Sequence, residues 1–516
     1  KYLLPPTSLY IDERKKIMKY ENPIIKGFYP DPSICRVEKD YYLVTSSMEY
    51  FPGIPLFHSR DLVNWEQIGN CISRQDCLPM EKVGDSGGVW APTIRYDQGR
   101  FYVTATLEGY GNFIISTEDP YAEWSEPVWV PVGGIDPSLY FEDGRAYYCT
   151  NQSLHPGMEE ITLEEIDIET GKLKSAVTSI WSGTGGGHLE APHLYKINGW
   201  YYLMAAEGGT NFNHMVTIAR SRSLWGEYES CKNNPILTNR HDTVKEIQCS
   251  GHGDLFQDHR GNWWMVHLGI RTARRTMSHL GRETFLTHIL WEDGWPSMGD
   301  GKMEMLEKEG PLWEEQKKKR VWKADFGKAA WEPQWIFVRG RRDSLFQRGD
   351  GKLSMHASRQ KSDREIGSAF AAVRPLDFAC IIGTEYQFCP QHTGDEAGMA
   401  IYLESGFHYR FGKRKTEQGE FIVLEKTAED FQQTACCIPV EPGKLRLKIE
   451  CSKEQYQFYY AFGKEAFQLA CTASTRFLSC EVAGRCFTGT VAGLYALSKE
   501  RTDAFAEYDS FYMEMK

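Results

Sequence analysis

The sequence predicts an all-β protein in which a five-bladed β-propeller is followed by a β-sandwich. Three observations support this prediction. One short pattern of adjacent bulky residues occurs five times, at intervals of 46 to 62 residues. Short strand-like runs are separated by turn residues, and amphipathic helical runs of useful length are absent. Five all-β units of similar length are typical of a propeller and not of a helical solenoid.

Each recurrence is a polar or glycine position followed by bulky residues and a β-rich run. We expect every one of them to form a strand within one blade. The five segments are Asp40–Val44, Arg100–Thr104, Arg145–Tyr148, Gly199–Leu203 and Asn262–Val266.

A second set of residues lies ten or eleven positions before the aromatic pair of each segment, a step of about one strand and one turn. Its members are Asp31, Trp90, Asp136, Glu190 and His252. The first strand of each blade lines the axis of a propeller, so equivalent positions on five blades converge at one end of the channel. The sequence therefore predicts that these five distant residues form one pocket.

The local contexts of these positions also agree in pairs. Asp31-Pro32-Ser33 resembles Asp136-Pro137-Ser138, and Trp90-Ala91-Pro92 resembles Glu190-Ala191-Pro192. A proline disfavours the α region for the residue before it, so we expect Tyr29 and Asp31 to be extended and rigid.

The pattern changes near Met305. Glu307 to Arg320 is rich in charge and is interpreted as a connector. Beyond it, alternating runs at Lys444–Ile449, Tyr456–Tyr460 and Val491–Tyr495 predict a two-sheet sandwich of the jelly-roll, concanavalin-like type. The expected division is an upstream leader at 1–17, a propeller at 18–305, a linker at 306–321 and a sandwich at 322–516.

Composition and charge exclude several classes of partner. A net charge of −11 and a pI near 5.8 argue against nucleic acid or an anionic membrane as a partner, and no run of 18 apolar residues is present. The 14 cysteines show no CxxC spacing, which indicates reduced thiols and a cytoplasmic location. A homo-oligomer is compatible with the sequence.

Three carboxylates in one pocket are costly unless they divide the chemistry between them, because close like charges push pKa values apart. Glycoside hydrolysis requires such a division, with one protonated carboxyl and one ionised carboxylate. Phosphoryl transfer is disfavoured because a Gly-Lys-Ser/Thr loop and a basic clamp are absent.

These residues resemble glycoside hydrolase family 43, whose five-bladed propellers include β-xylosidases and α-L-arabinofuranosidases. The resemblance also extends to the C-terminal sandwich of the xylosidase-like branch. The matching stretches are 22–24, 27–33, 49–53, 58–65, 90–96, 134–138, 190–195, 280–285, 394–399, 487–489 and 493–496.

The resemblance implies roles for the three carboxylates. Asp31 would be the general base that activates water, and Glu190 would be the general acid. Asp136 would raise the pKa of the acid and hold its orientation. Family members invert the anomeric centre in a single displacement, so the carboxyls of Asp31 and Glu190 are expected to lie roughly 6.5–9.5 Å apart.

The resemblance also implies substrate contacts. Trp90 would form a wall for the sugar ring and Arg282 would bind sugar hydroxyls, the alternative for Arg282 being an ion pair with Glu283. Met48, where the branch often has phenylalanine, and Phe51 would lie at another wall. For a residue of the sandwich that closes the pocket the candidate is Tyr508, with a place in the sandwich core as the alternative.

His252 resembles a channel histidine that lies beside a calcium ion or a water in many family members. A structural calcium ion and a water molecule both remain open, because a lone histidine is a weak signal and Ca²⁺ prefers oxygen ligands. The resemblance implies no cofactor for the chemistry itself.

The resemblance therefore implies an inverting exo-glycosidase that releases xylose from the non-reducing ends of β-1,4-xylo-oligosaccharides. One alternative is an α-L-arabinofuranosidase, or an enzyme with both activities, acting on oligosaccharides derived from arabinoxylan. A remote alternative is a non-catalytic carbohydrate-binding protein.

Overall fold

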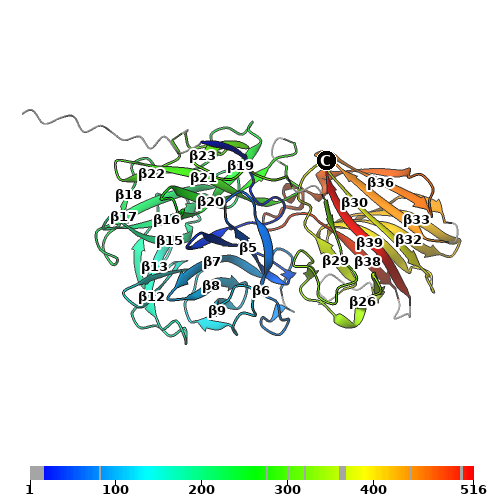
Figure 1. Cartoon of the computed structure of the whole chain (residues 1–516), viewed down its shortest axis with the longest axis horizontal. Helices are drawn as coiled ribbons and strands as arrows, with labels where there is room; N and C mark the ends of the chain where they lie inside the picture. The colour runs from blue at the N-terminus through cyan, green and yellow to red at the C-terminus, as the bar shows by residue number, and fades with distance from the viewer. Residues whose placement is uncertain are drawn as a thin grey trace, which may run out of the picture.

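The computed structural model consists of two β-rich bodies that lie side by side (Figure 1). It describes residues 17–80, 83–274, 277–299, 301–318, 321–359, 368–440, 443–499 and 504–516. Residues 1–16 of the expected leader therefore lie outside the described residues. No helix among the described residues is long and apolar enough to cross a membrane.

The first body is the predicted five-bladed propeller. Within the described residues each blade is a four-stranded antiparallel sheet. The inner strands are β2 (Ser33–Val37), β7 (Val89–Asp97), β11 (Ser138–Glu142), β15 (Glu190–Ile197) and β19 (Ile247–Gln257). The second strands are β3 (Asp40–Val44), β8 (Arg100–Leu107), β12 (Arg145–Gln152), β16 (Trp200–Glu207) and β20 (Trp263–Arg271).

Two further strands complete each blade. The third strands are β5 (Gly53–Ser59), β9 (Gly111–Thr117), β13 (Glu160–Ile166), β17 (Met215–Ser221) and β21 (Arg282–Glu292). The outer strands are β6 (Glu66–Ile72), β10 (Val128–Val130), β14 (Thr178–Trp181), β18 (Glu229–Ser230) and β22 (Trp295–Ser297).

The five sequence recurrences fall on the second strands, and the inner strands contact their neighbours in a ring from β2 through β7, β11, β15 and β19 back to β2. The bulky residues of the recurrences fill the spaces between adjacent blades. Tyr148, for example, is buried with Ile114 of the preceding blade, and Tyr202 is buried with Leu255 of the following blade. This packing explains why the pattern predicted the blade count correctly.

The ring is closed where the N-terminal segment lies along the fifth blade. β1 (Met18–Glu21) pairs with β23 (Glu307–Gly310), which belongs to the segment expected to be a linker. The Asn22 side chain both accepts from the Leu286 N–H at 3.0 Å and donates to the Leu286 carbonyl at 2.9 Å. These contacts fasten the start of the chain to β21.

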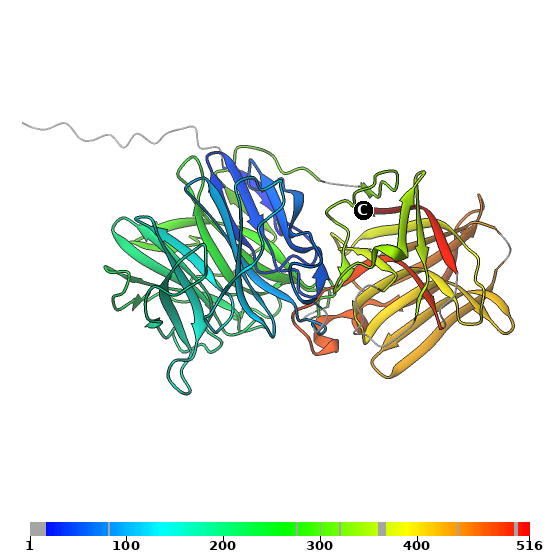
Figure 2. The same cartoon turned by 90° about the horizontal axis from the view of Figure 1, so that it is seen from below.

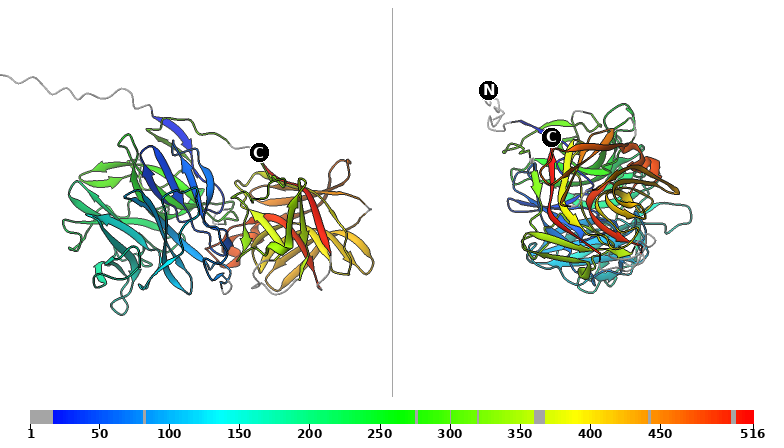
Figure 3. Two further views of the ribbon diagram at one scale, coloured as in Figure 1. Left: turned by 60° about the horizontal axis from the view of Figure 1, so that its bottom comes forward. Right: turned by 90° about the vertical axis from the view of Figure 1, so that its right-hand side faces the viewer.

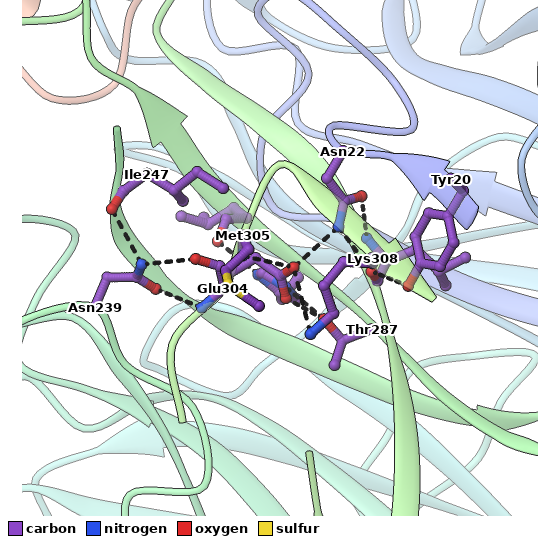
Figure 4. Close-up of polar contacts among 11 residues, drawn as sticks. Tyr20, Asn22, Asn239, Ile247, Thr287, Glu304, Met305 and Lys308 are labelled. Atoms are coloured by element: carbon purple, nitrogen blue, oxygen red, sulfur yellow. Dashed lines mark hydrogen bonds and ion pairs between the residues drawn. The ribbon is translucent and has the colours of Figure 1, made fainter. Parts of the chain in front are cut away.

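A buried carboxylate organises this closure (Figure 4). Glu304 accepts a hydrogen bond from Asn22 Nδ2 at 3.0 Å and one from the Thr287 hydroxyl. His267 Nε2 lies 3.1 Å from the carboxylate and Lys308 Nζ lies 3.9 Å from it. Burial alone would raise the pKa of Glu304, but the hydrogen bond and charge of His267 and the charge of Lys308 lower it.

The second body is a sandwich of two sheets, whose strands, in the part of the chain that the structure describes, pair antiparallel except for the parallel pair of β28 and β38. Among the described residues one sheet contains β24 (Val321–Lys323), β26 (Phe346–Gly349), β27 (Lys352–His356), β30 (Cys380–Phe388), β35 (Leu445–Cys451), β36 (Gln455–Phe462), β37 (Gln468–Ser474) and β39 (Phe505–Met515). The other contains β28 (Ser358–Arg359), β29 (Phe370–Val373), β31 (Glu396–Glu404), β32 (Phe407–Thr416), β33 (Gly419–Ala428), β34 (Phe431–Pro439) and β38 (Val491–Ser498). Alternate residues of β35 are buried, as the sequence pattern predicted.

Short helices occur in the sandwich as η2 (Asp343–Leu345), η3 (Thr475–Leu478) and α1 (Cys480–Ala483). The segment with η3 and α1 lies between the two bodies, where Figures 2 and 3 show it in orange-red beside the propeller.

The two bodies share backbone pairing and apolar packing. β4 (Tyr50–Phe51) pairs with β25 (Phe337–Val338). A mixed apolar cluster joins Phe28 and Met48 of the propeller to Ile336 and other residues of the sandwich. The sandwich is therefore fixed against the propeller face from which β4 extends.

We predict that Glu304→Gln lowers the free energy of unfolding by about 3 kcal/mol, because the buried carboxylate that Asn22, Thr287 and His267 contact loses its charge. The comparison uses urea denaturation of the wild type and the variant. Because the pKa of Glu304 is lowered, the difference is fully present above its unfolded pKa of about 4.3 and is lost as the pH falls through the folded pKa.

Glu309→Gln on β23 is the matched control, because its ion pair with Lys19 is exposed. An equal loss of stability in both variants would contradict a specific role for the buried carboxylate.

Candidate active site

Four of the five residues expected in one pocket, Asp31, Trp90, Asp136 and Glu190, stand at the entries of inner strands, and His252 lies in the middle of β19. Each of these places contains a residue with a left-handed backbone: φ is 56° at Asp31, 43° at Ala91, 52° at Asp136, 51° at Ala191 and 52° at His252. In β7, β15 and β19 the pairing register also shifts at this point. Such bulges redirect side chains next to active sites.

The expectation that Asp31 is extended was wrong. The following proline disfavours the right-handed α region, but aspartate tolerates the left-handed region, which the turn into β2 uses.

Asp31 is buried and is held by two donors. The Ser46 hydroxyl donates to its Oδ2 at 2.6 Å, and Arg282 Nη1 donates to its Oδ1 at 2.7 Å. Ser46 Oγ in turn accepts the Ala91 backbone N–H at 2.7 Å. The carboxylate is therefore oriented by three blades and its negative charge is balanced by one guanidinium.

Arg282 has donors left over. Its Nη1 also donates to Thr210 Oγ1 at 3.2 Å, whereas its buried Nε and Nη2 have no partner among the described residues. The expected alternative, an ion pair with Glu283, does not form, because Glu283 binds Arg271 at 2.7 Å. Two unsatisfied donors beside a carboxylate suit a ligand rich in hydroxyl groups.

Asp136 and Glu190 form a coupled pair of carboxyls. Burial, then the charges of Glu190 and Asp31, raise the pKa of Asp136 well above its ordinary value. Burial, then the charge of Asp31, raises the pKa of Glu190 to about 7. The pair therefore retains a proton near neutral pH beside the Arg282-bound carboxylate of Asp31, and this arrangement is suited to acid–base chemistry.

An aromatic wall covers one side of the pocket. The half-buried Trp90 donates its indole N–H to the Ser86 carbonyl at 3.1 Å, which fixes the ring. Its ring centroid lies 5.6 Å from that of Phe487, and the Arg282 guanidinium carbon lies 5.0 Å from the Phe487 centroid. Phe487 follows α1 in the sandwich, so the second body contributes directly to the site.

The alternative given for Tyr508, a place in the sandwich core, is confirmed, and Phe487 is the residue of the sandwich that reaches the pocket. Tyr508 is fully buried in the sandwich core, where its ring stacks on Tyr386 at 5.1 Å and its hydroxyl donates to backbone carbonyls. Its position on β39 directs it between the two sheets.

The substrate roles expected for Phe51 and Met48 are also corrected. Phe51 is buried in the apolar core of the sandwich, because β4 leaves the propeller to pair with β25. Met48 is 1% exposed in the cluster between the two bodies, against which Trp90 packs. Both residues support the docking of the sandwich and offer no open surface to a sugar.

His252 lies beside Asp31, with 3.8 Å between Nδ1 and Oδ1. Burial lowers the pKa of His252, so the ring is neutral near pH 7. The nearby carboxylate of Asp254 is engaged by Arg95 at 2.9 Å and by the hydroxyls of Ser33 and Tyr195. Within the described residues no group of three His, Cys, Asp or Glu residues could hold a metal ion, so these side chains fit calcium poorly.

Ser46 and Thr210 were not recognised from the sequence. Both follow a second strand, β3 or β16. Second strands run antiparallel to inner strands, so they end at the edge of the blade where inner strands begin. Polar residues just after the second strands were therefore a usable signal for this pocket.

Comparisons with known proteins agree with this geometry. Residues 20–296 match the sequence model of Glycosyl hydrolases family 43, and residues 323–514 match that of the beta xylosidase C-terminal concanavalin A-like domain. A non-reducing end α-L-arabinofuranosidase of Bacteroides ovatus is 36% identical, over 95% of this chain and 94% of the relative. A xylosidase/arabinosidase of Butyrivibrio fibrisolvens is 34% identical, over 96% and 99% of the two chains.

The crystal structure of xylan β-1,4-xylosidase from Bacillus halodurans superposes with a TM-score of 0.90 at 31% identity, covering 96% of this chain and 99% of that one. The fold, the carboxylate pocket and the matches over both bodies lead to one conclusion: this chain is a glycosidase and belongs to glycoside hydrolase family 43.

Proposed function

We propose that the enzyme is an inverting exo-glycosidase that releases xylose from the non-reducing ends of β-1,4-xylo-oligosaccharides. The observation that carries this proposal is the contrast between two carboxyls of one pocket. Glu190 has a pKa raised to about 7, whereas Asp31 is held by Ser46 and Arg282. One group can donate a proton while the other accepts one.

In the proposed reaction Glu190 gives its proton to the glycosidic oxygen as the bond to the anomeric carbon breaks. Asp31 removes a proton from the water that attacks this carbon from the opposite face. A separation of about 6.5–9.5 Å between the two carboxyls would leave room for that water. The products are a sugar of inverted anomeric configuration and a leaving group with a free hydroxyl.

We assign the proton of the coupled pair to Glu190 and the charge to Asp136. The Ala191 backbone N–H is hydrogen-bonded to Asp136 and favours its ionised form, against the burial and like charges that raise its pKa. Because close like charges push pKa values apart, an Asp136 that carries the charge of the pair would keep Glu190 protonated. Asp136 thus acts on the acid and not on the sugar.

The contribution of the sandwich to the site supports exo action. Phe487 lies close to both Trp90 and Arg282, so a sugar that reaches the free donors of Arg282 meets an aromatic side chain of each body. The proposed substrates are therefore short oligosaccharides derived from xylan.

The second candidate is an α-L-arabinofuranosidase, or an enzyme with both activities. The names of the relatives favour it, because one is an α-L-arabinofuranosidase and another a xylosidase/arabinosidase. Both pentoses present similar hydroxyl groups to the donors of Arg282.

Calcium has no step in this mechanism, because the channel residues fit it poorly and the acid and base are both carboxyls. A cytoplasmic location remains a prediction. It is supported by the cysteines, all 14 of which are free thiols.

The function is tested with 4-nitrophenyl β-D-xylopyranoside, 4-nitrophenyl α-L-arabinofuranoside and xylobiose. We expect the wild type to prefer the xyloside, and Asp31→Ala to lower kcat on it by about 10²–10⁴-fold, because the water loses its base. Glu190→Gln should impair xylobiose hydrolysis by a similar factor but nitrophenyl xyloside hydrolysis less, because nitrophenolate leaves without a proton.

Asp40→Ala serves as the control, because Asp40 pairs with Arg60 and His58 away from the pocket. A faster wild-type reaction on the arabinofuranoside would favour the second candidate. Binding of xylo-oligosaccharides without turnover of any substrate would contradict enzymatic function and support a carbohydrate-binding protein.

The pH dependence of kcat/KM provides a separate prediction. Glu190 must be protonated to act as the acid and its pKa is raised to about 7, so activity should fall as the pH rises through about 7. The Glu190→Gln variant should lack this basic limb. An unchanged basic limb in that variant would assign the titration to another group.

A further inference from the structure

The peptide unit of Leu189, directly before Glu190, is held from both sides by the third blade. Glu159 Oε2 accepts the Leu189 N–H at 3.0 Å, and Asn151 Nδ2 donates to the Leu189 carbonyl at 3.0 Å. Asn151 lies near the end of β12 and Glu159 lies directly before β13. The connection between β12 and β13 of blade 3 therefore fixes Leu189, the residue before the proposed acid Glu190 on blade 4.

The second polar atom of Asn151 holds the segment of Asp136. Asn151 Oδ1 accepts the Ile135 N–H at 2.9 Å, and Ile135 directly precedes Asp136. The backbone segments of Gly134 and Asn151 lie so close together that only glycine fits at position 134. A Cβ atom on Gly134, whose φ is +83°, would lie 1.6 Å from the backbone carbonyl oxygen of Asn151. A single amide side chain therefore connects the residues that precede both members of the coupled pair.

Regular strand pairing does not fix these two carboxyls. Glu190 pairs with Ala206, but the register shifts before the next pair at His193. Asp136 stands outside β11, which begins at Ser138. Since both residues also have left-handed backbone at or beside them, their positions depend on contacts outside the ladder.

We propose that Asn151 and Glu159 form a clamp that positions Glu190 relative to Asp136, and that this clamp is required for proton donation to the leaving group. The inference rests on the proposed function of Glu190. The two are positioning residues, because they act through the backbone of Leu189 and Ile135.

Glu159 also adds an electrostatic contribution. Its charge raises the pKa of Glu190, in addition to burial and the charge of Asp31. Charged and titratable groups face Glu190 from several elements: Asp31 and Asp136 before the inner strands, Arg282 on β21, Glu159 before β13, and Cys486 on the loop of the sandwich. Glu159 is the exposed carboxylate of this set, so substitution there changes the charge with little change in packing.

The positioning role is tested with Asn151→Ala. We expect kcat on xylobiose to fall by about 10–100-fold with KM changed by less than about threefold, because a misplacement of about 1 Å is enough for such a loss. The loss should be smaller on 4-nitrophenyl β-D-xylopyranoside, whose leaving group needs no proton. A merely structural role would lower both activities equally.

Asn234→Ala is the matched control. The Asn234 side chain also holds a backbone unit from both sides, accepting the Ile218 N–H at 3.0 Å and donating to the Ile218 carbonyl at 2.9 Å, but in the outer part of blade 4. This variant should lose similar stability and keep its activity on both substrates.

Glu159→Gln separates charge from geometry, because an amide oxygen can still accept the Leu189 N–H. We expect kcat at the optimum to change by less than about twofold, while the basic limb of the pH profile moves down by about half a unit. Glu159→Ala should show the same shift and also lose kcat on xylobiose.

The inference is overturned if folded Asn151→Ala keeps wild-type kcat on xylobiose, or if Glu159→Gln leaves the basic limb in place and Glu159→Ala retains full activity. Failure of the proposed function has a different signature, namely full xylobiose activity in Glu190→Gln. The two failures are therefore distinguished by which variant retains activity.

Discussion

The repulsion among three buried carboxylates is the constraint on which the rest of this structure depends. Asp31, Asp136 and Glu190 meet at one end of the propeller channel, where burial weakens the screening of their charges. The guanidinium of Arg282 balances the negative charge of Asp31. A proton retained by Asp136 and Glu190 relieves the repulsion between these two carboxyls. The same compromise that makes the cluster stable supplies a protonated and an ionised carboxyl in one pocket.

Both bodies of the protein help to position this carboxylate cluster. Ring closure by β1, β23 and the buried Glu304 keeps the five inner strands converging on the channel. The docked sandwich then supplies Phe487, which faces Trp90 and Arg282 and narrows the pocket. A propeller alone would leave this side open, so both bodies belong to the functional unit.

Much of this arrangement could be predicted from the sequence, because strand periodicity and blade repetition leave local signals. The five recurrences identified the second strands, and a step of ten or eleven residues back from their aromatic pairs found Asp31, Trp90, Asp136, Glu190 and His252.

The left-handed backbone at Asp31 was missed, since the following proline suggested an extended residue. Phe51 and Met48 were misplaced because their environment is set by how the sandwich docks, and this leaves no periodic signal in the sequence. Asn151 was missed because its partners, Ile135 and Leu189, are distant in the chain.

The central claim is that Asp31 and Glu190 act from opposite faces of the sugar in a single displacement. ¹H NMR of the first product formed from a β-xyloside tests this most directly, provided that spectra are recorded before mutarotation. The account predicts that α-xylose appears first and then equilibrates with the β anomer. Initial release of β-xylose would contradict it, because retention requires a carboxylate nucleophile and a covalent intermediate.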